Sequence, residues 1–248
     1  MRTILSVQNL SKSFGGVHAV NDCSFEVKEG KITALIGPNG SGKSTLFNLI
    51  SGVLERDKGK INFNENEISQ FSLEKWAKLG LSRVFQSPRL FGNLTVKENL
   101  LIALTDKDTN FWKSFFNIEK DTKKAQADVK HALALVGLER FEEKKAADLS
   151  FGQKRLVELS RAMLKEHKLL MLDEPVGGVT PILRTKIAQM LLVQRKKGDT
   201  IFLIEHDMNF VLGIADEVFV LDEGKIIAQG TPAQIRKNKK VLEAYLGK

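Results

Sequence analysis

Residues 37–45 restrict most strongly what this sequence can fold into. They read Gly-Pro-Asn-Gly-Ser-Gly-Lys-Ser-Thr and fit the pattern G-x-x-x-x-G-K-[ST]. An apolar run, Ile32–Ile36, precedes them, and a second run, 46–50, follows. This context predicts a buried strand, a glycine-rich turn and then a helix, which is what a phosphate-binding loop requires. The alternative is a chance match in a glycine-rich turn, and the flanking apolar runs disfavour it.

The loop predicts a nucleotide site for a physical reason. Glycine lets the backbone curl until several N–H groups face phosphate oxygens, and the start of the following helix adds its positive end. Lys43 would reach the β- and γ-phosphates, and the Ser44 hydroxyl would help to hold Mg²⁺.

Composition places the chain among ordinary globular proteins. Its 248 residues are 42% hydrophobic and 27% charged, and no apolar run approaches the roughly 20 residues of a membrane-spanning helix. Residues 1–10 alternate like a strand and lack the apolar core of a signal peptide, so we expect a cytoplasmic protein. The single cysteine, Cys23, permits no internal disulfide, which agrees with a reducing compartment.

The net charge of +8 raises the question of an anionic partner. The basic residues are mixed with acidic ones, and no stacking aromatic residues interleave them. We therefore expect a solvated basic surface and no nucleic-acid partner. The one dense basic cluster, 236–240, is predicted to lie on an exposed helix.

The period of the apolar residues predicts an α/β fold with an insertion. Strands are expected at 3–10 and 24–28, with a turn at 11–16 between them and a short edge strand at 59–63. Helices are expected at 72–79, 95–104 and 120–136, the second starting with a capping box of Thr95 and Glu98. Strands are expected at 81–86, 169–172 and 201–204, and the last two flank a helix at 182–192. A hairpin with its turn at 222–224 and a mostly helical tail complete the chain.

No linker rich in proline or glycine separates the middle helices from the rest. We therefore expect one domain over 1–248, with a nucleotide-binding core and antiparallel β subdomain at 1–86 and 167–248. Residues from about 87 to 166 would form a helical subdomain inserted into that core.

Two further stretches carry candidate chemistry. The apolar strand 169–172 ends in Asp173 and Glu174, of which Asp173 could hold Mg²⁺ through water and Glu174 could orient or deprotonate an attacking water. Ser150 and Gly152 lie at the start of a helix, which is an anion site of the same type as the first loop. Alone, each pattern is weak, because acidic residues often end strands and serine often caps helices.

Taken together, these stretches resemble the ATP-binding cassette (ABC) ATPases over essentially the whole chain. The matches are 37–45 (Walker A), Gln86 (the Q-loop), 149–153 (the family signature), 169–174 (Walker B) and His206 (the switch histidine). The resemblance implies a P-loop NTPase core with a mostly parallel sheet, an antiparallel β subdomain and a helical insertion. The stretches 85–100 and 244–247 further resemble importers of branched-chain amino acids.

The resemblance implies roles for particular residues. Phe14 would stack on adenine, although it could instead be a hydrophobic plug in its turn. Gln86 would contact Mg²⁺ and the attacking water, Glu174 would be the general base and His206 would contact the γ-phosphate. Phosphates and Mg²⁺ would be held by the loop, namely Asn39, Gly40, Ser41, Gly42, Lys43, Ser44 and Thr45. Signature residues of a second subunit, Ser150 and Gly152 with Gln153 beside them, would complete the site.

Two positions depart from the family pattern, and one cluster has no assigned role. Phe151 stands where the signature usually has glycine, and Thr180 stands where the family often has aspartate, which leaves coupling between subunits open. The aromatic cluster 111–116 either packs near a permease or membrane face or belongs to the core.

The leading hypothesis is therefore an ATPase subunit that dimerises around two ATP molecules and drives a separate integral-membrane permease. The transported substrate would be a branched-chain or other hydrophobic amino acid, delivered by an extracytoplasmic binding protein. The subunit would lie on the inner face of the cell membrane through its permease. The alternatives are the ATPase of a lipid or lipopolysaccharide exporter, a soluble ABC protein without a permease, and an interaction module without turnover; Glu174 and His206 disfavour the last.

Overall fold

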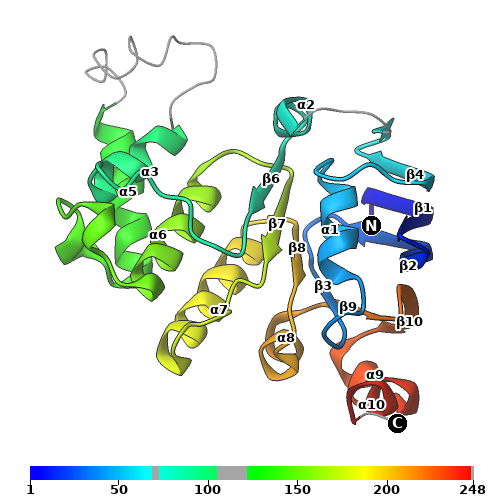
Figure 1. The fold of residues 1–248 in the computed structure, drawn as a ribbon. Helices are drawn as coiled ribbons and strands as arrows, with labels where there is room; N and C mark the ends of the chain where they lie inside the picture. The colour runs from blue at the N-terminus through cyan, green and yellow to red at the C-terminus, as the bar shows by residue number, and fades with distance from the viewer. Residues whose placement is uncertain (69–72, 105–121, 247–248) are drawn as a thin grey trace. The chain divides into compact units, whose positions relative to one another are not determined.

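The computed structural model describes residues 1–68, 73–104 and 122–246, and it contains both strands and helices along most of the chain (Figure 1). The chain divides into two compact units. Unit 1 contains Met1–Gln86, His167–Val176 and Leu191–Lys248, and unit 2 contains Ser87–Glu166 and Gly177–Met190. The aromatic cluster 111–116 lies outside the described residues.

The first sheet of unit 1 has six strands in the order β10-β9-β3-β8-β7-β6. All neighbours are parallel except β9 and β10, which form the predicted hairpin. Every residue of the three strands β3, β7 and β8 is buried, as their uninterrupted apolar runs predict. The strands are β3 (Ile32–Ile36), β6 (Leu81–Val84), β7 (Leu169–Asp173), β8 (Ile201–Ile204), β9 (Glu217–Asp222) and β10 (Lys225–Gly230).

The second sheet of unit 1 is antiparallel, in the order β2-β1-β4-β5. Its strands are β1 (Thr3–Phe14), β2 (Val17–Lys28), β4 (Lys58–Phe63) and β5 (Asn66–Glu67). The turn predicted at 11–16 is too long, because Lys12 pairs with Val20 and Phe14 with Val17, and the turn is confined to the two glycines. The strand β4 is not at the edge, since β5 pairs beyond it.

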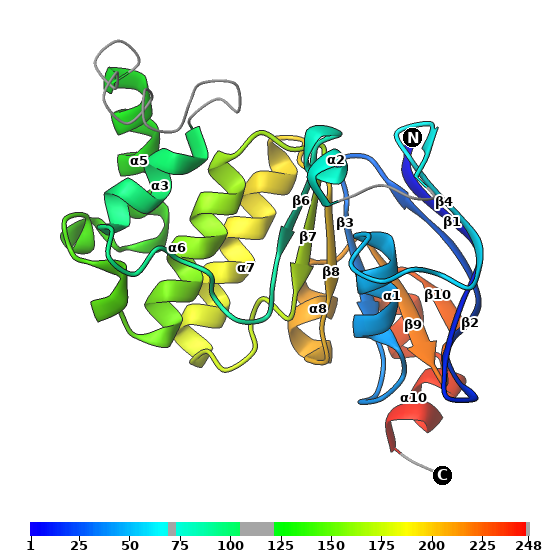
Figure 2. The same ribbon diagram turned by 45° about the horizontal axis from the view of Figure 1, so that its top comes forward.

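Helix α1 (Lys43–Ile50) packs between the two sheets (Figures 1 and 2). Its apolar face buries Leu46, Phe47, Leu49 and Ile50 in a core that both sheets share. The Phe47 ring lies 5.1 Å from that of Phe202 on β8, measured between ring centroids. This packing holds the start of α1, and the loop before it, at the end of β3.

Three short helices follow the core strands of unit 1, α8 (Met208–Ile214), α9 (Pro232–Arg236) and α10 (Lys239–Leu246), and α2 (Leu73–Lys78) precedes β6. The basic cluster 236–240 does not lie on one helix, because α9 ends and α10 begins within it. The interruption has a local cause, since the Asn238 side chain accepts a hydrogen bond from the backbone N–H of Lys240 (3.0 Å) at the start of α10.

Unit 2 is built from α3 (Val96–Leu104), α5 (Thr122–Val136) and α6 (Phe151–Leu164), which pack on one another. Two 3₁₀ turns, η1 (Glu139–Phe141) and η2 (Ala146–Asp148), connect α5 to α6. The capping box predicted before α3 is present, because the Glu98 carboxylate accepts from the Thr95 N–H and the Thr95 hydroxyl accepts from the Glu98 N–H. Helix α7 (Pro181–Lys196) begins in unit 2 and ends in unit 1.

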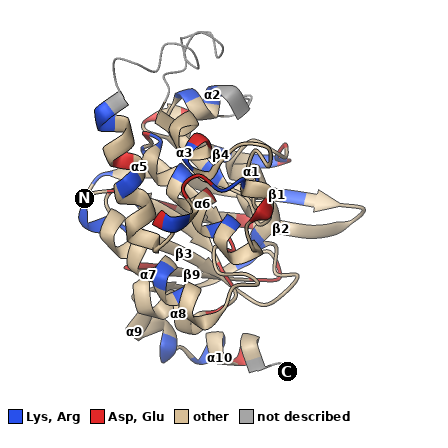
Figure 3. Ribbon diagram, turned by 90° about the vertical axis from the view of Figure 1, so that its left-hand side faces the viewer, with Lys and Arg blue, Asp and Glu red and all other residues tan. Residues whose placement is uncertain are grey.

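The fold class therefore agrees with the sequence prediction: a mixed α/β chain with one mostly parallel sheet, one antiparallel sheet and several helices. None of the described helices is long and apolar enough to cross a membrane. The ribbon of Figure 3 carries both lysines and arginines (blue) and aspartates and glutamates (red), and α5 and α6 contain residues of both kinds.

Candidate functional site

The glycine-rich loop lies between β3 and α1, where the sequence predicts it, and two of its glycines are required sterically. A Cβ on Gly37 would lie 2.0 Å from the carbonyl oxygen of Leu221, and a Cβ on Gly42 would lie 2.1 Å from that of Ala19. Gly42 also has a φ of 102° as it caps α1, a conformation that side chains disfavour. The backbone therefore passes closer to β9 and β2 than any other residue type would permit.

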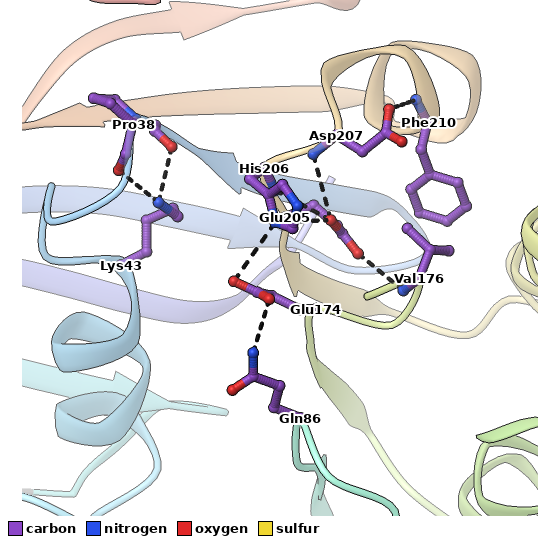
Figure 4. A network of polar contacts seen from close by, with 10 residues as sticks. Pro38, Lys43, Gln86, Glu174, Val176, Glu205, His206, Asp207 and Phe210 are labelled. Atoms are coloured by element: carbon purple, nitrogen blue, oxygen red, sulfur yellow. Dashed lines mark hydrogen bonds and ion pairs between the residues drawn. The ribbon is translucent and has the colours of Figure 1, made fainter. Parts of the chain in front are cut away.

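Lys43, the first residue of α1, is folded back over this loop. Its ammonium group donates hydrogen bonds to the carbonyl oxygens of Gly37 and Pro38, both at 2.8 Å (Figure 4). Burial lowers the pKa of Lys43, and the nearby carboxylates of Glu174 and Glu205 oppose that shift. A buried cation with acidic neighbours is thus held at the start of a helix.

The rest of the loop offers groups suited to an anion and a hard cation. The Ser41 hydroxyl is buried, and it has no hydrogen-bond partner among the described residues, so a ligand oxygen would satisfy it. Asn39, Gly40 and Ser44 are exposed, and Thr45 is half-buried. Hydroxyl, amide and carboxylate oxygens, as on Ser44 and on the side chains described next, are the ligands that Mg²⁺ prefers, so the donor set fits this ion.

Asp173 ends β7 and is paired with an arginine. The Arg83 guanidinium, on the neighbouring strand β6, donates a 2.9 Å hydrogen bond to the Asp173 carboxylate. The two side chains are only 7% and 12% exposed. Among the described residues, no cluster of three or more His, Cys, Asp or Glu side chains could hold a metal alone.

Glu174 is the centre of the site, since two other predicted residues meet its carboxylate. The Gln86 amide donates a hydrogen bond to one oxygen (3.0 Å), and His206 Nδ1 lies 3.7 Å from the other (Figure 4). Glu174 adopts a φ of 44°, which is rare for a residue with a side chain. Its N–H donates to the carbonyl oxygen of Ile204, so the end of β8 fixes this backbone.

Glu205, which was not predicted from the sequence, fixes the backbone that follows β7 and β8. Its fully buried carboxylate accepts hydrogen bonds from the backbone N–H groups of Val176 (2.9 Å), His206 (3.1 Å) and Asp207 (3.4 Å) (Figure 4). Burial raises the pKa of Glu205, and these hydrogen bonds oppose that shift. Asp207 caps α8 by accepting from the Phe210 N–H (3.0 Å), so both loops after β7 and β8 are fixed.

The signature residues lie in unit 2, at the start of α6. Ser150 caps the helix in a reciprocal box: its hydroxyl accepts from the Gln153 N–H (3.3 Å), and the Gln153 side chain accepts from the Ser150 N–H (2.9 Å). A Cβ on Gly152 would lie 2.3 Å from a methyl group of Leu183. Phe151, at the position of the unusual aromatic, is 48% exposed and packs near Gly178.

Phe14 and Tyr245 are two aromatic residues of unit 1 that bear on the site. Phe14 ends β1, is 48% exposed, and has the Lys12 ammonium 5.5 Å from its ring centroid, so it does not plug its turn. Tyr245 lies on α10, which the ribbon views draw beside the loop between β3 and α1 (Figures 1 and 2). Burial raises the pKa of Tyr245 to about 12, against the opposing effect of the Gly37 backbone.

Three features of the site were not predicted from the sequence: Arg83, Glu205 and the approach of Tyr245 to Gly37. Arg83 lies three positions before Gln86 and Glu205 one position before His206, so proximity to a predicted residue was the signal available for both. Nothing local in the sequence indicates that Tyr245 approaches Gly37.

Comparison with known proteins places these features in a family. The family described as "ABC transporter" matches residues 20–177, and the family described as "Branched-chain amino acid ATP-binding cassette transporter" matches residues 225–248. The high-affinity branched-chain amino acid transport ATP-binding protein BraF of Pseudomonas aeruginosa is 38% identical, over 99% of this chain and 98% of its own length. LivG of Escherichia coli K12, which carries the same description, is 36% identical over 98% of each chain.

Solved structures agree with the sequence comparison. The structure titled as the ADP conformation of MJ1267, an ATP-binding cassette of an ABC transporter, superposes with a TM-score of 0.84 at 35% identity and covers all of both chains. A nucleotide-free ATP-binding cassette from an ABC transporter superposes with a TM-score of 0.81 at the same identity, again over all of both chains.

Proposed function

The chain belongs to the ABC transporter family, and on that premise we propose that it is the ATPase subunit of a transporter that takes up branched-chain amino acids. Relatives named for branched-chain amino acid transport, at 36–38% identity over nearly the whole chain, support this substrate class over lipid export. The observation that carries the catalytic assignment is the meeting of Glu174 with Gln86 and His206 at the ends of three separate segments.

Binding of ATP would use the loop groups already described. Lys43 exchanges its two carbonyl partners for phosphate oxygens, and backbone N–H groups from Asn39 to Thr45 surround them. Ser44, Gln86 and Asp173 would hold Mg²⁺, which supplies charge neutralisation on the phosphates. Phe14, half-exposed at the end of its hairpin, offers a ring to the adenine.

Hydrolysis would use Glu174 as the general base. Its carboxylate accepts the proton of the attacking water, while the Gln86 amide holds the carboxylate in place. His206, on the other side of that carboxylate, donates to the γ-phosphate. The buried carboxylate of Glu205 fixes the backbone that carries His206, so the base and the histidine keep their separation.

The partners follow from the same assignment. Ser150 and Gly152 at the start of α6 would meet the γ-phosphate bound by a second copy or a paralogue, so that two ATP molecules join two subunits. We infer one ABC domain with a helical subdomain at about 87–166. Integral-membrane permease subunits would hold the protein at the inner face of the membrane, and an extracytoplasmic protein would deliver the amino acid.

The substitution Glu174→Gln tests this function. It keeps the shape of the side chain but removes the base, so we expect ATP binding to persist while turnover falls by about 10²-fold or more. With ATP present, the variant should accumulate as a dimer, measured by light scattering alongside phosphate release.

Glu217→Gln is the matched control, because Glu217 lies in the same unit on β9, where its carboxylate accepts a hydrogen bond from the Gln229 side chain (2.9 Å). It should keep normal turnover. Normal turnover in Glu174→Gln would remove Glu174 as the base. Reconstitution with the permease subunits and the binding protein of a branched-chain amino acid importer, and a test for leucine-dependent ATPase activity, would examine the substrate class.

A further inference from the structure

Arg83 is a buried cation beside the candidate metal ligand Asp173, and the proposed mechanism gives it no part. One of its terminal nitrogens donates to the Asp173 carboxylate at 2.9 Å, and the other donates to the Ser51 hydroxyl. Ser51 is itself buried at the end of α1 and donates to the carbonyl oxygen of Phe47 (2.9 Å). The guanidinium thus joins the end of α1 to the end of β7.

The orientation of the guanidinium is fixed by two aromatic rings. Its central carbon lies 5.4 Å from the ring centroid of Phe47 and 4.7 Å from that of Phe85, within the range of cation–π attraction. Residue 83 is also paired in register with Met171, two residues before Asp173. A guanidinium held in this way bonds two partners at once, the Asp173 carboxylate and the Ser51 hydroxyl.

This pairing changes the charge that an approaching cation meets. The negative charge of Asp173 is offset by a permanent positive charge at hydrogen-bond distance, in a place where both side chains are largely shielded from solvent. Mg²⁺ is usually bound in such sites by one or two carboxylates together with substrate phosphates. A metal ion without phosphates would therefore meet a carboxylate that is already neutralised.

We propose that Arg83 positions Asp173 and makes divalent-cation binding at this carboxylate depend on the phosphates of the nucleotide. The inference rests on the proposed role of Asp173. Arg83 suppresses metal binding before the nucleotide arrives, and the negative charge of the phosphates then outweighs the guanidinium. Arg83 is a positioning residue, because it acts through Asp173.

Binding of Mn²⁺ to the full-length protein, followed by the electron paramagnetic resonance of the free ion, tests this proposal without relying on turnover. The affinity is measured with and without ADP in the unmodified protein and in three variants. Arg83→Met removes the charge and Arg83→Lys keeps it. Arg195→Met is the matched control, because Arg195 pairs with Asp216 in the same unit, outside the contacts of the site.

In the unmodified protein, ADP should strengthen Mn²⁺ binding strongly. Arg83→Met should bind Mn²⁺ without ADP about tenfold more tightly or better, because a unit charge a few ångströms away has at least that effect at a partly buried site. The increase in Mn²⁺ affinity that ADP causes should therefore be smaller in Arg83→Met than in the unmodified protein. In Arg83→Lys and in Arg195→Met, the Mn²⁺ affinity should stay within about threefold of that of the unmodified protein. This range is smaller than the effect expected from losing a charge beside Asp173.

An unchanged ADP dependence in Arg83→Met would overturn the proposal. If that variant does not fold, Arg83→Lys decides alone, because tighter binding without ADP would show that charge is not the determinant. Asp173→Asn, made in the Arg83→Met background so that no unpaired guanidinium remains, separates this proposal from the proposed function. Weaker Mn²⁺ binding with ADP would uphold Asp173 as a ligand, whereas unchanged binding would remove it and the role of Arg83 with it.

Discussion

Glu174 is held in a backbone conformation that few non-glycine residues adopt. A φ of 44° costs on the order of 1–3 kcal/mol for such a residue, and here the hydrogen bond from its N–H to Ile204 maintains it. The two consecutive carboxylates have different partners: Asp173 meets Arg83, while Glu174 meets Gln86 and His206. The candidate metal ligand and the candidate base are therefore held separately.

Glu205 gives a pH-dependent prediction at the same scale. Its pKa is raised by burial above the ordinary value of the unfolded chain, about 4.3, so the folded state retains this proton over a pH range in which the unfolded state has lost it. This contribution to stability is complete below the unfolded pKa and is lost as the pH rises through the folded pKa. Inside that window the loss approaches about 1.4 kcal/mol per pH unit.

The substitution Glu205→Gln should remove this dependence. Urea unfolding of both proteins between about pH 4 and pH 7 should therefore show that the stability advantage of the unmodified protein shrinks as the pH rises. Other carboxyl groups contribute equally to both proteins and cancel. An advantage that grows with pH would mean that the three backbone hydrogen bonds dominate over burial.

At the scale of elements, the packing of α1 sets the position of the loop at 37–45. The helix is anchored between two sheets through its apolar face, and the loop before it passes within contact of β2 and β9. The steric requirement at Gly42 therefore links the binding loop to strands that are distant in the sequence. Gly213 on α8 has no such requirement, because no atom lies within 4 Å of the place that a Cβ would occupy there.

Replacing each of these glycines by alanine tests the difference. Gly42→Ala forces a Cβ onto the carbonyl oxygen of Ala19 and should cost roughly 1–3 kcal/mol of stability and most of the ATP affinity. Gly213→Ala should stabilise the protein by about 0.5–1 kcal/mol through helix propensity and leave ATP binding unchanged. Thermal unfolding and fluorescent-nucleotide titration measure both effects. Equal ATP affinity in Gly42→Ala and Gly213→Ala would show that the close approach of Gly42 to Ala19 is not needed for ATP binding.

At the scale of the whole molecule, the proposed site is shared between two copies. Unit 1 carries the loop and the base, whereas Ser150 and Gly152 lie in unit 2 at the start of α6. A subunit on its own should therefore bind ATP, and ATP should then join two subunits. The departures at Phe151 and Thr180 leave the Ser150–Gln153 capping box intact.

Ser150→Asp examines this sharing. Aspartate caps a helix as well as serine does, so α6 should be preserved, but its charge would repel the γ-phosphate of the partner. In a Glu174→Gln background, we expect light scattering to show no ATP-dependent dimer, with ATP binding to the monomer retained. Ser150→Asn is the control, because asparagine caps the helix without adding a charge. This variant should dimerise more readily than Ser150→Asp. Dimerisation of both variants alike would argue against a phosphate contact at Ser150.

The local features of this protein can be predicted from short stretches of its sequence. The loop at 37–45, the buried strands and the capping box before α3 depend on residues close together in the chain, and the structure has each of them as predicted. The family also follows from the sequence, because its motifs are short and ordered. These features could be read directly because the backbone conformation and the burial of a segment are set largely by its own residues.

Contacts between side chains that are distant in the sequence depend on the tertiary fold. Arg83 and Asp173 are 90 positions apart, and Gln86 and Glu174 are 88 apart, so strand order and register had to be known first. The extension of β1 through residues 11–14 has the same cause, because pairing with β2 overrides a stretch that reads locally as a turn. The candidate phosphate loop can be recognised from its own sequence, whereas the parallel sheet brings together the candidate base, the candidate metal ligand and the cation beside it.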